Sequence, residues 1–67
     1  MFTIRLNNKR NQYGEYVVKV FKNDELYEPD TYYTDDYYDA LKTMRIIAKD
    51  LHLKVYKDDH GVYHARW

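Results

Sequence analysis

Apolar and polar residues alternate with a period of two over several short stretches of the chain, a pattern typical of β-strands. Residues 2–6 place three apolar side chains on one face of such a strand. Residues 15–22 are rich in β-branched and aromatic residues on both faces, which predicts a strand inside a sheet rather than at its edge. Residues 53–57 and 62–67 alternate again and predict two further strands near the C-terminal end.

Turn-forming residues divide the first half of the chain. Asn23 and Asp24 form a two-residue turn candidate, which would make residues 15–28 a hairpin. Pro29 limits the returning strand because proline lacks the amide donor that a paired strand needs. Residues 31–33 are expected to resume the extended conformation.

The period changes after this point and predicts one amphipathic helix over residues 34–51. Thr34 is the expected N-cap, with Asp35 and Asp36 in the first turn, where the helix dipole favours acidic side chains. One face of this helix carries an apolar stripe at steps of three and four residues, formed by Tyr37, Ala40, Leu41, Met44, Ile47, Ala48 and Leu51.

The predicted order of elements is β-β-(β)-α-β-β, which indicates an α+β fold. We expect a small antiparallel sheet of four to five strands with one helix packed on one face, all within a single domain over residues 1–67. The pattern leaves open which face of strand 15–22 contacts the helix.

Charge is distributed unevenly, although 11 basic and 11 acidic residues cancel. Residues 23–41 carry a charge of −7 and no Lys or Arg, whereas residues 1–22 carry +4 and residues 42–67 carry +3. Five of the nine tyrosines also lie in the acidic middle segment. Such asymmetry bears on binding partners rather than on the fold.

The acidic, tyrosine-rich segment favours a small protein-binding module, such as an inhibitor from a phage or mobile element, that engages the basic surface of a nucleic-acid-handling protein. Tyrosine provides a large contact area at low entropic cost, and carboxylates steer a basic partner. The predicted contacts are Tyr32, Tyr33, Asp35, Asp36 and Tyr38.

A nucleic-acid-binding domain is the alternative. The sheet face turned away from the helix would interleave basic and aromatic residues, as single-strand binders do. That face would show Thr3, Arg5, Val17, Lys19, Phe21, Lys54, Tyr56, His64 and Arg66. The loop Asn7–Gln12 would add cations and amides that reach phosphates or base edges. The predicted contacts are Arg5, Lys9, Arg10, Lys19, Phe21, Tyr56 and Arg66.

The sequence argues against an enzyme, a metal site and a cofactor. It has no Ser or Cys, and its two glycines form no phosphate-binding loop. His60 and His64 lie near Asp58 and Asp59 but lack the spacing of a zinc motif. We therefore expect no catalytic residue, no metal ligand and no cofactor.

The composition also bears on location and self-association. Cysteine is absent, and the N-terminal residues show no signal peptide, so we expect a protein in the cytoplasm of a bacterial host, without a membrane partner. Unpaired strands at the sheet edges, the last of them ending in Trp67, leave homodimerisation open.

In size, lack of cysteine and order of elements, the chain resembles small phage and mobile-element proteins, including some anti-CRISPR inhibitors. Residues 13–51, interpreted as strands followed by a helix, are similar in outline to the three-stranded DNA-binding domains of some tyrosine-type integrases, which use a basic sheet face. The first resemblance implies a protein partner, and the second implies a DNA partner.

Overall fold

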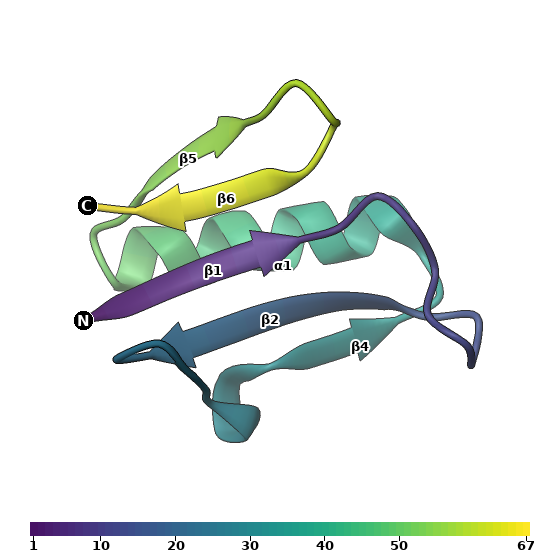
Figure 1. The fold of residues 1–67 in the computed structure, drawn as a ribbon, viewed down its shortest axis with the longest axis horizontal. Helices are drawn as coiled ribbons and strands as arrows, with labels where there is room; N and C mark the ends of the chain where they lie inside the picture. The colour runs from purple at the N-terminus through teal and green to yellow at the C-terminus, as the bar shows by residue number, and fades with distance from the viewer.

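A computed structural model describes residues 1–67, with one α-helix lying behind an antiparallel β-sheet in the view of Figure 1. This arrangement confirms the predicted α+β fold with a helix on one sheet face. The sheet has six strands rather than the predicted four to five, because residues 25–34 form two short strands separated by a 3₁₀ helix. The elements are β1 (Phe2–Leu6), β2 (Tyr16–Lys22), β3 (Glu25–Leu26), the 3₁₀ helix η1 (Glu28–Asp30), β4 (Tyr32–Thr34), α1 (Tyr37–Asp50), β5 (Lys54–Lys57) and β6 (Tyr63–Arg66).

The sheet order is β3-β2-β1-β6-β5, and β4 pairs with β2 beside β3. The N-terminal strand therefore lies in the middle, between β2 and the C-terminal strand β6 (Figure 1). Strand β2 is paired along both sides, as its two apolar faces predicted. The sheet thus has an N-terminal part, β1 to β4, and a C-terminal hairpin, β5–β6, which pair with each other only through β1 and β6.

The turn between β2 and β3 confirms the predicted hairpin. Asn23 and Asp24 both have positive φ angles, of 52° and 68°. A two-residue hairpin turn of this handedness matches the right-handed twist of its strands, and Asn and Asp tolerate the conformation better than most residues. Pro29 ends the pairing as expected, because it lies in η1 and not in a strand.

Helix α1 begins three residues after the predicted N-cap. Thr34 is the last residue of β4, paired with Tyr16, and its Oγ1 accepts a hydrogen bond from the amide of Asp36, which precedes the first helical residue. Asp36 is the N-cap, and its Oδ1 accepts hydrogen bonds from the amides of Tyr38 at 2.9 Å and Asp39 at 3.4 Å. The prediction of Thr34 as the cap was wrong because both residues are good caps and strand pairing decided between them.

The hydrophobic core lies between α1 and the sheet. The predicted stripe is confirmed, since Ala40, Met44 and Ala48 are buried and its other members pack around them. The sheet contributes the buried residues Ile4, Leu6, Val18, Val20 and Ala65, with Leu53 at the end of the core. Because Val18 and Val20 face the helix, the alternate residues of β2 point to the opposite face.

Helix α1 has 14 residues, and no helix in the structure is long and apolar enough to span a membrane.

Candidate nucleic-acid interface

The sheet face turned away from α1 carries a set of basic and aromatic side chains, which we call the open face. Strand pairing places them because residues directly opposite each other project to the same side of a sheet. The open face comprises Thr3 and Arg5 of β1, Val17, Lys19 and Phe21 of β2, Lys54 and Tyr56 of β5, and His64 and Arg66 of β6. These are the nine residues that the sequence predicted for this face. Leu26 of β3 and Tyr33 of β4 extend it at one edge.

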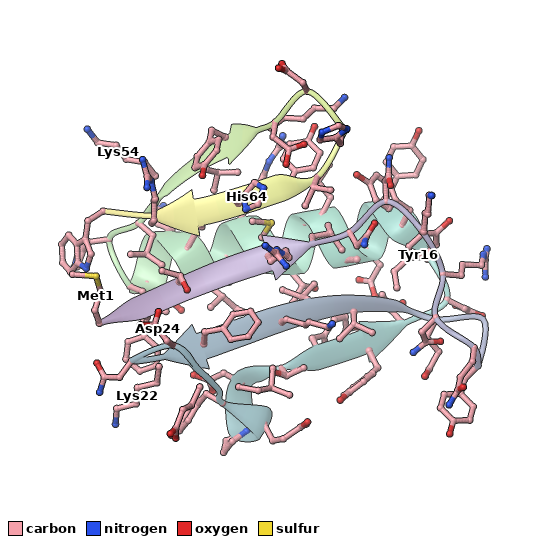
Figure 2. The ribbon with its side chains drawn as sticks, in the orientation of Figure 1. Met1, Tyr16, Lys22, Asp24, Lys54 and His64 are labelled. Atoms are coloured by element: carbon pink, nitrogen blue, oxygen red, sulfur yellow. The ribbon has the colours of Figure 1, made fainter.

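One row of the open face brings cations and rings together across four strands. Lys19 lies opposite Arg5, Arg5 lies opposite His64, and His64 lies opposite Tyr56. Figure 2 shows His64 on β6 and Lys54 on the neighbouring strand β5. No Lys or Arg side chain lies within ion-pair distance of a carboxylate, and the one contact of that kind joins the His64 ring to Asp58. Like charges directly opposite each other destabilise a sheet, which makes this row unfavourable in the free protein.

An aromatic stack occupies the β5–β6 side of the open face. The ring of Tyr56 is stacked on the ring of His64, with centroids 5.1 Å apart and planes inclined by 18°. The guanidinium of Arg66 lies 5.7 Å from the centroid of Tyr56. Tyr56 remains 43% exposed, so the stack borders solvent and presents flat π surfaces to it.

Asp58 fixes the position of this stack. Its Oδ2 lies 2.8 Å from Nε2 of His64, and its Oδ1 accepts hydrogen bonds from the backbone amides of His60 and Val62 in the β5–β6 turn. The hydrogen bond from His64, followed by those from the two amides, lowers the pKa of Asp58 to about 2. Gly61 completes this turn with a φ of +80°, a conformation that side chains disfavour.

Two adjoining hollows lie on the open face and differ in chemistry. The first, of about 340 Å³, lies between Phe21 and the Tyr56–His64–Arg66 stack, with Asp24 at its rim. Figure 2 places Asp24 at the end of β2 beside the start of β1. The second, of about 180 Å³, has an almost wholly polar lining in which Arg5, Lys9, Arg10 and Lys19 accompany one carboxylate, that of Glu15. Arg5 lines both hollows and therefore joins the aromatic part of the face to the cationic part.

The loop between β1 and β2 is held by its own side chains. Asn11 Oδ1 accepts hydrogen bonds from the amides of Tyr13 and Glu15. Arg10 donates from Nη1 to the Gly14 carbonyl at 2.8 Å, and its guanidinium lies over the Tyr16 ring. Lys9 and Arg10 both line the second hollow, but the Arg10 guanidinium is held against Tyr16, whose ring packs on Tyr37 of α1.

The predicted protein-binding residues are distributed differently. Tyr32 pairs with Val18 and so lies on the helix side of the sheet, where its hydroxyl donates to Asp39 at 2.7 Å. That bond lowers the pKa of Asp39 and raises that of Tyr32. Tyr33 pairs with Val17 and so lies on the open face. The two neighbouring tyrosines therefore project to opposite faces.

The remaining members of that set lie at the start of α1. Asp36 is engaged as the N-cap, whereas Asp35 and Tyr38 are exposed, Tyr38 by 79%. The Tyr38 ring contacts the Tyr37 ring edge to face at a centroid distance of 6.0 Å. Of the five predicted contacts, only Asp35 and Tyr38 are both exposed and free of a hydrogen bond to another side chain or to a helix amide.

Sequence reasoning did not single out four residues that shape the open face. His64 and Lys54 were placed on it but were not among the predicted contacts. The role of Asp58 was missed, because its bond to His64 depends on the β5–β6 register and no local pattern encodes it. Asp24 at the rim of the first hollow was assigned only to a turn.

Nowhere in the structure do three His, Asp or Glu side chains gather closely enough to hold a metal ion. Comparison with protein-family models, with curated proteins and with solved structures gives no match to this chain.

Proposed function

We propose that this protein binds nucleic acid through the open face of its sheet. The observation that carries the proposal is the row of unpaired cations beside an exposed aromatic stack, with Lys19 and Arg5 directly opposite each other. A row of Lys and Arg side chains suits the phosphates of a nucleic-acid backbone. Aromatic rings beside such a row can stack on the bases.

The arrangement of charge over the molecule supports this proposal. Acidic residues are as numerous as basic ones, yet no Lys or Arg of the open face forms an ion pair, although Asp24 and Glu15 line its two hollows. Surface ion pairs are common because opposite charges close to each other gain modest stability. The Lys and Arg side chains of the open face form no such ion pairs, and Lys19 lies opposite Arg5. An anionic ligand that binds there would relieve the repulsion between these two side chains.

The proposal is tested by fluorescence anisotropy with labelled single-stranded and duplex DNA, titrated at about 50 mM and about 200 mM salt. We expect binding at low salt that weakens steeply as salt rises. The variant Arg5→Gln/Lys19→Gln removes the two opposed cations. For a single strand it should lower the slope of log K against log salt by about 1.4, since each phosphate contact contributes about 0.7.

A matched control comes from helix α1 on the other side of the molecule. Lys42 and Lys49 are exposed there, so Lys42→Gln/Lys49→Gln removes the same charge away from the open face. This control should bind like the wild type. Equal losses in the two double variants would show a response to net charge alone, and no binding of either nucleic acid at low salt would refute the proposal.

A second candidate function, binding to a basic protein, is favoured by one separate observation. Asp35 and Tyr38 are exposed together at the start of α1, within the segment that carries −7 charge, and Tyr38 is the most exposed tyrosine there. An exposed ring beside a free carboxylate suits a basic protein surface, on which tyrosine anchors and the carboxylate steers. An inhibitor of a nucleic-acid-handling protein would use such a surface.

The test for this candidate must spare the helix cap. Asp36→Ala would weaken α1 and confuse loss of folding with loss of binding, so the informative variant is Asp35→Lys/Tyr38→Ala. A nuclease-treated bacterial lysate is passed over the immobilised wild type and variant. A protein retained by the wild type and lost with the variant supports the candidate, whereas no protein, or equal retention by both, rejects it.

A further inference from the structure

Given nucleic-acid binding through the open face, on which this inference rests, we infer that the ligand is single-stranded. In this arrangement unpaired bases enter the hollow between Phe21 and the Tyr56–His64–Arg66 stack. The phosphates that follow them lie in the neighbouring hollow, where the cations Arg5, Lys9, Arg10 and Lys19 outnumber the single carboxylate of Glu15.

The width of the open face argues against duplex DNA. Its functional residues extend from β2 across β1 and β6 to β5, three strand spacings or about 14 Å between backbones before side chains are added. The major groove of B-DNA is only about 12 Å wide and admits an α-helix or a two-stranded ribbon. A face this broad would rest on the phosphate ridges and hold its central aromatic residues away from the base edges.

The aromatic groups fit unpaired bases better than paired ones. Bases within a duplex already stack on their neighbours, whereas bases of a single strand are free to stack on aromatic rings or on an Arg guanidinium. The stack offers both kinds of surface, because the Tyr56 ring is exposed and Arg66 lies against it. Phe21 bounds the same hollow from β2, so the hollow has an aromatic surface at each of its two sides.

Arg5 sets the path of the strand over the face. It lines both hollows and lies opposite both Lys19 and His64. Arg5 is therefore at the boundary between the hollow that takes bases and the hollow that takes phosphates. A single strand therefore crosses β1 from the β5–β6 hairpin toward the loop between β1 and β2. The Cα extents of 29 × 26 × 19 Å limit the site to about four nucleotides, the lower end of the range for small single-strand binders.

The experiment compares labelled oligothymidylate of about 12 nucleotides, oligouridylate of the same length and a DNA duplex of equal length. Each is titrated at low salt with wild type, Tyr56→Leu and Tyr56→Phe. We expect the single strands to bind at least about tenfold more tightly than the duplex. Tyr56→Leu should lose roughly fivefold or more on single strands, the lower range of base–aromatic stacking, while Tyr56→Phe retains the ring and the affinity.

Circular dichroism establishes that each variant is folded, and Tyr56→Phe provides a ring-retaining variant with the smallest structural change. Preference for either DNA or RNA single strands supports the inference and identifies the natural class. Duplex binding equal to or tighter than single-strand binding overturns it while leaving the proposed function in place. Normal single-strand binding by folded Tyr56→Leu also overturns it, and binding of none of the probes refutes the proposed function itself.

Discussion

Replacing Lys19 by Glu should stabilise the free protein while impairing nucleic-acid binding. Lys19 and Arg5 lie directly opposite each other, so their Cβ atoms are about 5 Å apart and their flexible charged ends can separate to about 8 Å. Two unit charges at that separation in water repel by about 0.5 kcal/mol. Lys19→Glu turns this repulsion into a similar attraction, a change of about 1 kcal/mol that should raise Tm by roughly 4–8 °C in a domain of this size.

Thermal melts followed by circular dichroism measure the shift, at low salt and at about 1 M salt, where screening should remove most of it. Lys19→Gln should show about half the increase because it removes the repulsion without adding attraction. Lys42→Glu alters net charge by the same amount but lies near Asp39, whose pKa Lys42 helps to lower, so it should not stabilise. An unchanged or lower Tm for Lys19→Glu at low salt would refute the claim that the open face holds opposed, uncompensated cations.

Three further predictions concern the framework that carries the open face. Met44 is fully buried beneath the sheet, so Met44→Ala should cost about 2–5 kcal/mol in urea denaturation, a large part of the stability of so small a domain. Asp36→Ala removes the N-cap of α1 and should lower the free energy of unfolding by about 1 kcal/mol. Thr34→Ala should lower it by less, because Thr34 does not cap the helix. Because the folded protein lowers the pKa of Asp58 from 3.8 to about 2, the stabilising effect of its carboxylate is present above about pH 4 and is lost as pH falls toward 2. Wild type should therefore lose more stability over that range than Asp58→Asn, and equal losses would contradict the role given to Asp58.

Local sequence patterns predicted the strands and the helix well where one face of the element is buried in the core and the other is exposed. The alternation of residues 2–6 matched β1, and the apolar stripe from Tyr37 to Leu51 matched the buried side of α1. The positive-φ turn at Asn23 and Asp24 was also recognisable, because few residues tolerate that conformation. Prediction was less accurate at the start of α1, where Thr34 and Asp36 compete as caps and only the pairing of β4 with β2 decides.

The open face could be predicted only in outline. Its nine residues follow from alternation once one face of β2 is assigned to the helix, but the sequence left that assignment open. Which residues lie side by side depends on the pairing of β1 with β6, the first and last strands of the chain. That long-range pairing sets Arg5 opposite His64, and the β5–β6 register brings His64 to Asp58 and Tyr56. No local periodicity carries this information.

The most direct test of the central claim is an NMR titration of the labelled protein with oligothymidylate at low salt. The ring protons of Tyr56 and the side-chain Nε–H signals of Arg5 and Arg66 should shift as the strand binds, together with amides of β1 and β6. The ring of Tyr38, exposed at the start of α1, should remain unperturbed. Shifts concentrated on Tyr38 and α1, or none at all, would contradict the account.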